Sequence, residues 1–264
     1  MDHDEEVVII GAGICGLATA LALHKKGIKS VVMERSESLR NVTGAAIGIR
    51  PNGWRALDQL GIGDNLRHTA VRIQRAREIS LVGGTKKELS LVPWDGETRC
   101  LRRKDLIDTL YAALPIGTVK FGCQLESIKP DPRSNKPVLC LNNGSSITPK
   151  VVIGCDGAKS IIADFLNLKP TRMFPSSSIR GLTNYPNDGK VWEDPNGTVT
   201  VAGDAMHVMG PFLGQGGSAG LEDAVVLART MAQLDLNSVA SGSKVKVHEV
   251  EEAFNLYVKQ RRMR

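Results

Sequence analysis

Residues 11–16, with the sequence GAGICG, have the GxGxxG spacing of a phosphate-binding turn. In such a turn the first glycine permits a tight backbone bend, and the second, here Gly13, lets the backbone approach a pyrophosphate closely. Free amides at the start of the following helix then bind the anion. Glu34 lies 23 positions after Gly11, where its carboxylate can accept hydrogen bonds from ribose hydroxyl groups. The spacing therefore predicts a site for an adenine dinucleotide.

A second glycine-rich stretch, residues 203–217, follows another apolar run that we expect to be a buried strand. Asp204 comes directly after that strand, at the edge where doubly wound sheets bind their ligands. Residues 214–217, GQGG, then open a predicted helix. A flavin needs both features, because its ribityl hydroxyls need an acceptor and a helix amino terminus stabilises negative charge on the reduced ring. This stretch favours FAD over NAD.

Other kinds of chemistry have little support in the sequence. It contains no HExxH motif, no Ser-His-Asp order and no pair of carboxylates suited to hydrolysis. The five cysteines are odd in number and include no CxxC pair, so we expect neither a disulfide framework nor a metal site. We interpret Cys15 as a packing residue rather than a redox thiol, and His207 as a structural residue rather than an acid or base.

These motifs require strands that alternate with helices. The apolar run 7–10, the helical pattern 14–26 and the strand pattern 29–35 predict a right-handed crossover unit of a parallel sheet. The last helix presents one apolar face, formed by Val247, Val250, Phe254 and Val258. Further helices are predicted over 51–60, 103–114, 160–166 and 217–234, further strands over 119–128, 138–142, 146–153 and 197–202, and a hairpin over 73–92.

The composition is that of an ordinary globular protein. The 264 residues are 42% hydrophobic and 23% charged, with 34 Lys and Arg against 28 Asp and Glu, which gives a net charge of +6. No apolar run approaches the roughly 18 residues that a membrane span needs. The acidic first residues lack the pattern of a targeting peptide, so we expect a cytoplasmic location. We interpret the basic end (Lys259, Arg261, Arg262, Arg264) as a solvated helix terminus rather than a nucleic-acid surface.

Taken in order, the segments GAGICG, VVMER, CLRRKDL, VVIGCDG, VAGDAMH and GPFLGQGG resemble the FAD-dependent aromatic-hydroxylase family of flavoprotein monooxygenases, and most of all its plant salicylate-hydroxylase-like members. The resemblance implies an α/β fold, with a Rossmann-like FAD-binding domain on a parallel sheet and an antiparallel β substrate region. It also implies FAD as the cofactor, NAD(P)H as the reductant, and transfer of one atom of O₂ to a small aromatic or similar organic substrate.

The same resemblance implies roles for individual residues. Arg103, rather than Arg102, would contact FAD. Asp156 belongs to a motif that serves both FAD and NAD(P)H. The backbone of residues 124–125 would contact adenine. Asp204 would meet the ribityl–pyrophosphate portion. The expected cofactor-binding residues are Gly11, Ala12, Gly13, Ile14, Cys15, Gly16, Glu34, Arg35, Arg103, Leu125, Asp156, Gly203, Asp204, Gly214, Gln215, Gly216 and Gly217.

The chain departs from the family pattern in one serious respect. Only 46 positions separate Gly157 from Gly203, and this interval normally builds most of the antiparallel sheet over the substrate. With strands of roughly 5–6 residues it holds two or three strands at most. Val208 in place of proline and Ala163 in place of arginine are smaller departures. The chain also stops at Arg264, where the family continues, which favours a shortened isoform or an incomplete gene model.

We therefore expect one discontinuous FAD-binding domain, about residues 1–72, 100–172 and 191–264, with remnants of a substrate domain at about 73–99 and 173–190. Two functions stay open: a monooxygenase, or a non-catalytic or uncoupled FAD-binding remnant. A NAD-dependent dehydrogenase or a flavin disulfide reductase is disfavoured, because the sequence has one GxGxxG and no CxxC. A basic binding module is disfavoured because the cationic residues are not clustered with aromatic ones.

Overall fold

The computed structural model describes residues 7–39, 46–73, 75–79, 86–90, 97–134, 136–168, 198–207, 215–233 and 244–262. Its centre is a five-stranded sheet in the order β13-β12-β1-β2-β8, and every neighbouring pair is parallel. The strands are β1 (Val7–Ile10), β2 (Val31–Met33), β8 (Val119–Lys120), β12 (Val151–Gly154) and β13 (Val199–Val201). The predicted α/β class with a parallel sheet is confirmed.

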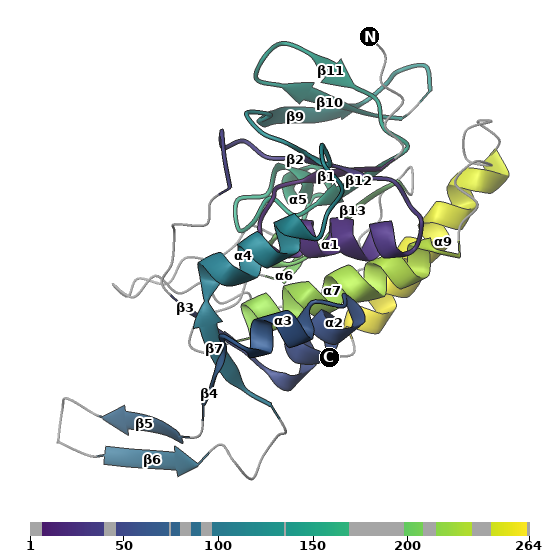
Figure 1. The fold of residues 1–264 in the computed structure, drawn as a ribbon. Helices are drawn as coiled ribbons and strands as arrows, with labels where there is room; N and C mark the ends of the chain where they lie inside the picture. Colours follow the sequence, from purple (N-terminus) through teal and green to yellow (C-terminus); the bar gives the residue numbers. More distant parts are fainter. Residues whose placement is uncertain are drawn as a thin grey trace.

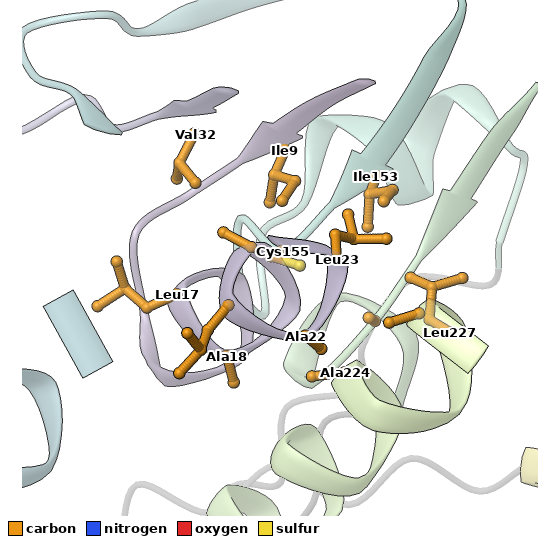
Figure 2. Close-up of a cluster of buried hydrophobic side chains, with 14 of the residues drawn as sticks. Ile9, Leu17, Ala18, Ala22, Leu23, Val32, Ile153, Cys155, Ala224 and Leu227 are labelled. Atoms are coloured by element: carbon orange, nitrogen blue, oxygen red, sulfur yellow. The ribbon is translucent and has the colours of Figure 1, made fainter. Parts of the chain in front are cut away.

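Helix α1 (Ile14–Lys25) is the buried centre of the helical layer. All its residues from Gly16 to Leu23 are buried, because it lies between the sheet and helix α7 (Gly216–Met231). Figure 2 shows strand residues such as Ile9 above Leu17 and Leu23, with Ala22 close to Ala224 of α7. Small residues at this contact let the two helix backbones approach closely.

Helix α1 lies on the same side of the sheet as α4 (Arg103–Ala112) and α7 (Figure 1). A separate antiparallel sheet, β11-β10-β9, lies on the other side. Its strands are β9 (Leu125–Pro130), β10 (Pro137–Leu141) and β11 (Ser146–Ile147). The short helix α5 (Ile161–Phe165) packs between β9 and the parallel strands β12 and β13.

Two smaller sheets complete the described chain. The antiparallel sheet β3-β7-β4 is made of β3 (Ala46–Ile49), β7 (Arg99–Arg102) and β4 (Val71–Arg72). Helix α2 (Pro51–Gln59) follows β3 and packs on α7, and α3 (Gly63–Arg67) follows α2. Strands β5 (Arg75–Ile79) and β6 (Lys86–Ser90) form the predicted hairpin, which projects away from the parallel sheet in Figure 1.

One short helix was not predicted, whereas the last helix was. The unpredicted helix is α6 (Asp204–His207), which begins three residues after β13 ends, in a segment that we expected to be a turn. Helix α9 (Lys244–Arg262) packs against α7, and its residues Val250, Phe254 and Tyr257 are buried. Among the described helices, none combines the length and the apolar character that a membrane crossing requires.

Two predicted strands are wrong as single elements. The segment 119–128 divides into β8 and β9, which belong to different sheets, because the chain turns at Gly122 with φ of 68°. The segment 146–153 likewise divides into β11 and β12, with Pro149 between them, where proline cannot donate a ladder hydrogen bond. Apolar alternation predicted strand character correctly but did not reveal the change of sheet.

Candidate functional site

Two adjoining hollows lie at the carboxyl ends of the parallel strands. The first has a volume of about 230 Å³ and the second about 470 Å³. Residues within two positions of the ends of four strands border the hollows. They are Gly11 after β1, Glu34 after β2, Cys155 after β12 and Gly203 after β13. The hollows share the lining residues Gly13, Arg103, Cys155 and Gly157, so they form one continuous groove.

Glu34 connects the first hollow to the glycine-rich turn. Its side chain is buried, one carboxylate oxygen accepts the Ala12 amide at 2.8 Å, and the other accepts the Ser36 amide at 3.0 Å. Each carboxylate oxygen carries a second lone pair. Glu34 therefore fixes the turn and keeps acceptor capacity for a ribose hydroxyl in the same hollow.

The three glycines of the turn serve different purposes. Gly11 has φ of 100°, and a Cβ there would lie 2.5 Å from the carbonyl oxygen of Cys155. A Cβ at Gly16 would lie 1.9 Å from the carbonyl oxygen of Gly11. At Gly13, by contrast, a Cβ would meet no described atom within 4 Å, because it would project into the groove. The first two glycines allow the backbone to close, and Gly13 leaves space for a ligand.

The amino terminus of helix α1, which is the positive end of its dipole, faces the open space beside Gly13. Gly13 is its N-cap residue, with no side-chain cap among the described contacts, and its first turn contains no acidic residue. The first amides of a helix have no partner within it, and the helix dipole places positive charge at that end. The groove therefore offers a backbone anion site at the point where the two hollows join.

Two charged residues border this junction from other elements. Arg103 begins α4 and lines both hollows, whereas the side chain of Arg102 is 75% exposed and pairs with Asp105. Asp156 lines the first hollow and accepts hydrogen bonds from the Ser160 hydroxyl and the Ile161 amide, at 2.6 and 2.8 Å. Burial raises the pKa of Asp156, and those hydrogen bonds oppose the shift. Asp156 thus also caps the start of α5.

The second hollow is bordered by Asp204 and by the start of α7. The Asp204 carboxylate is open to the hollow, while desolvation by the surrounding protein raises its pKa. The first residues of α7 line the same hollow, together with Ala46 and Gly48 of β3. An acceptor and a helix amino terminus therefore meet here, as a flavin requires.

Asp223 of α7 holds the Asp204 loop in place. It is fully buried, and one of its oxygens accepts the Gly203 amide at 2.8 Å and contacts His207 Nε2 at 2.5 Å. Its other oxygen accepts Arg261 Nε at 2.5 Å. Burial alone would raise the pKa of Asp223 and lower the pKa of His207. The hydrogen bond and the opposite charges between the two residues outweigh burial. The pKa of Asp223 is therefore lowered, and the pKa of His207 is raised. Both shifts favour the charged forms, and the His207 side chain contacts Asp223 and does not line either hollow.

The interpretation of the basic carboxyl end as a solvated terminus is wrong for Arg261. Its side chain is 7% exposed and pairs with Asp223 and, at 3.1 Å, with Glu222. Tyr257, one turn earlier, donates a hydrogen bond to the carbonyl oxygen of Val201 in β13 at 3.1 Å. Arg261 continues the helical face of Val250, Phe254 and Tyr257, and this spacing was the available signal. Helix α9 is thus fastened to the strand and loop that carry Asp204.

The structure brings the predicted site residues together with two exceptions. Gly16 packs against the turn rather than lining the groove, and Gly214 lies outside the described residues. The other fifteen border one or both hollows. Lining residues that the sequence reasoning missed include Ala46, Ile47, Gly48, Lys159 and Ile161. No motif marks these residues, because only the packing of β3 and α5 places them at the groove.

Comparison with known proteins identifies the family and its cofactor. A family model described as FAD binding domain matches residues 4–183 and 173–241. Monooxygenase 1 of Arabidopsis thaliana is 40% identical, in an alignment covering 98% of this chain and 86% of the relative. The chain belongs to the family of FAD-dependent monooxygenases. The predicted resemblance is confirmed, and FAD is the cofactor of the family.

The chain is also similar to one further hydroxylase in sequence and to one further FAD-binding protein in fold. The 3-hydroxybenzoate 6-hydroxylase 1 of Aquipseudomonas alcaligenes is 33% identical over 57% of this chain and 40% of the relative. Klebsiella pneumoniae HpxO, solved in complex with FAD and uric acid, superimposes with a TM-score of 0.67. That likeness covers 99% of this chain and 88% of HpxO at 21% identity, and it supports the shared fold.

The alignment with Monooxygenase 1 also confirms the internal shortening. The alignment is 347 positions long, but it contains only 98% of the 264 residues of this chain, which is about 259 residues. About 88 positions of the relative are therefore aligned with gaps in this chain. The family model matches in two parts that meet at residues 173–183, inside the interval from Gly157 to Gly203. The break between the two parts of the family match therefore lies in the interval that the spacing indicated.

The described residues fit FAD. The open space at Gly13, the helix terminus behind it and the remaining acceptor capacity of Glu34 suit a pyrophosphate and a ribose. Asp204 and the start of α7 suit the ribityl chain and the ring. When bound, FAD supplies the redox chemistry, and the chain supplies its place and its surroundings.

Proposed function

We propose that the chain is an NAD(P)H- and O₂-using monooxygenase that hydroxylates a small aromatic or similar organic substrate. The observation that carries this proposal is the continuous groove, in which acceptor, anion site and helix terminus occur in the order that FAD needs. The balanced reaction consumes the substrate, NAD(P)H, a proton and O₂, and yields the hydroxylated product, NAD(P)⁺ and water. The hydroxybenzoate hydroxylase among the relatives supports an aromatic substrate.

In this proposal each residue binds or orients rather than reacts. Glu34 accepts from the adenosine ribose, while the α1 terminus and Arg103 stabilise the pyrophosphate. Asp204 accepts from the ribityl hydroxyls, and the amino terminus of α7 stabilises negative charge on the reduced ring. Leu125 and Gln124 border the adenine end of the first hollow. The chain is then one discontinuous FAD-binding domain with a reduced substrate region.

A second function is favoured by the internal gap of about 88 positions. Oxygen activated at a flavin reaches the substrate only where water is excluded, since otherwise it leaves as peroxide. The hairpin β5–β6 is a two-stranded sheet, and a two-stranded hairpin is marginally stable in water. On this alternative the chain is a FAD-binding remnant that converts NAD(P)H, a proton and O₂ into NAD(P)⁺ and hydrogen peroxide.

The two functions differ in the amount of hydroxylated product formed for each NAD(P)H consumed. The purified protein is saturated with FAD and supplied with NADH or NADPH and a panel of small phenolic acids. NAD(P)H consumption, hydrogen peroxide and hydroxylated product are measured in the same reaction. Product that equals at least half of the NAD(P)H consumed, with any one acid, supports the monooxygenase. Peroxide that equals NAD(P)H with every acid supports the remnant.

A matched variant shows whether either activity arises in the groove. Asp204→Asn keeps the size of a side chain that borders the second hollow, and it should lower both the FAD affinity and the NAD(P)H consumption. A protein that stays colourless and takes up no FAD on titration would contradict both functions.

A further inference from the structure

Two of the five cysteines meet beneath the junction of the two hollows. Cys15 lies in the first turn of α1, and Cys155 directly follows strand β12. The two residues are 140 positions apart in the sequence, but their Sγ atoms are 3.8 Å apart. Cys155 borders both hollows and Cys15 borders the second. This pair therefore lies in the floor of the FAD groove.

The backbone holds both cysteines in this position. The Cys155 amide donates to the carbonyl oxygen of Ile10 at 2.8 Å, in line with the pairing of β12 with β1. Cys15 packs against Gly203, where an added Cβ would lie 2.8 Å from the Cβ of Cys15. The two sulfur atoms are thus kept close to contact distance by elements that the fold itself fixes.

We propose that Cys15 and Cys155 form a peroxide-sensitive dithiol whose oxidation to a disulfide closes the FAD groove. The oxidant is hydrogen peroxide. One thiolate attacks a peroxide oxygen and the O–O bond breaks, which leaves a sulfenic acid and hydroxide. The second thiol attacks that sulfur, the S–O bond breaks and water leaves. Two thiols and one peroxide give one disulfide and two water molecules, so the sulfurs lose two electrons and the peroxide gains them.

Disulfide formation would move the two turns that carry the anion site. A disulfide has an S–S length of about 2.05 Å, so the present 3.8 Å separation must shorten by about 1.8 Å. Gly13, two residues before Cys15, and Gly157, two residues after Cys155, border both hollows. Drawing these turns together narrows the space that the pyrophosphate needs, so the oxidised protein binds FAD at least tenfold more weakly.

The two thiols react slowly with peroxide. The hydrogen bond between Cys15 and Cys155, and then burial, raise the pKa of the Cys15 thiol. Since the thiolate is the reactive form, the dithiol stays reduced until peroxide accumulates. FAD in the groove covers the side from which peroxide would reach the sulfurs, and the bound cofactor therefore protects the pair.

The test is peptide mapping of the wild-type protein after exposure to hydrogen peroxide, with and without saturating FAD. After the remaining thiols are blocked in denaturant, trypsin should release one linked pair, residues 1–25 joined to 151–159. Its mass should be two hydrogen atoms below the sum of the free peptides. We expect this pair in the FAD-free protein, formation at least tenfold slower with FAD, and an FAD affinity that dithiothreitol restores.

Matched variants separate this pair from general oxidation. Cys15→Ser and Cys155→Ser should each abolish both the linked peptide and the peroxide-induced loss of FAD affinity. Cys140→Ser, which changes a thiol in β10 outside the groove lining, should retain both. The proposal is overturned if the wild-type protein gives no linked 15–155 peptide, if the cysteines pair at random or between molecules, or if the linked protein binds FAD as tightly as the reduced one.

Discussion

Replacing Arg261 with methionine should destabilise both the fold and the FAD site, although the arginine lies outside the groove lining. The substitution keeps much of the side-chain length but removes the ion pairs with Asp223 and Glu222, at 2.5 and 3.1 Å. Breaking a buried ion pair costs about 3–5 kcal/mol when the other charge is left alone. Here Asp223 keeps its contacts with His207 and the Gly203 amide, so we expect a loss of about 2–3 kcal/mol in the free energy of unfolding.

The effect on FAD follows from the contacts of Asp223. That carboxylate holds the amide of Gly203, and the next residue, Asp204, borders the second hollow. Loosening this loop should weaken FAD binding on the order of tenfold, which corresponds to about 1.4 kcal/mol. FAD affinity is measured by fluorescence titration at a temperature where the variant is fully folded.

The stability effect is measured by urea unfolding followed by circular dichroism. Lys259→Met is the matched control, because Lys259 is an exposed cation on the same helix, and it should change stability by less than about 0.5 kcal/mol. A double variant with Asp223→Asn should show a coupling of about 1–3 kcal/mol between the two sites. If Arg261→Met unfolds at the same urea concentration as Lys259→Met, the buried ion pair does not fasten α9 to the Asp204 loop.

Three further predictions concern the groove itself. Asp204→Ala should weaken FAD binding by about 1–3 kcal/mol, the scale of hydrogen bonds to a charged group, and an unchanged titration would make Asp204 an ordinary loop residue. Gly13→Val should lower FAD affinity at least tenfold and leave the unfolding midpoint nearly unchanged, whereas Gly11→Ala should lower the midpoint, because its backbone has φ of 100° and its Cβ would meet Cys155. Because Asp223 raises the pKa of His207 above its ordinary value, the stabilisation from their pair is complete below about pH 6.5 and is lost as the pH rises through the raised pKa. The stability difference between wild type and His207→Gln should therefore shrink from pH 6 to pH 9, and a constant difference would contradict the ion pair.

Local patterns in the sequence were enough to place the nucleotide-binding unit. An apolar run ending at Gly11 and a helical pattern ending at Gly27 gave β1 and α1 to within a residue. These elements depend on short-range effects: the positive φ of Gly11, the helix period and the free amides at the helix start. The order of motifs also indicated the α/β class, the monooxygenase family and the missing interval.

Boundaries and short strands were harder to predict for a physical reason. Strands such as β8 and β11 contain two residues each, which is too few to show a period. The sheet β3-β7-β4 joins segments that lie far apart in the sequence, and its register depends on packing against α2 and α7. Nothing in residues 46–48 themselves indicates that they line the second hollow.

The contacts that distinguish this site depend on tertiary structure. Asp223 and Arg261 are 38 positions apart, and Cys15 and Cys155 are 140 apart. In the sequence, Arg261 is one of four cations at a chain end and Cys15 is a small residue in a turn. The fold buries Arg261 because a fully buried Asp223 needs a partner charge, and it brings the cysteines together because β1 and β12 are neighbours in the sheet. Sequence determines which residues can turn, cap or bind, but burial and strand order decide which of them meet.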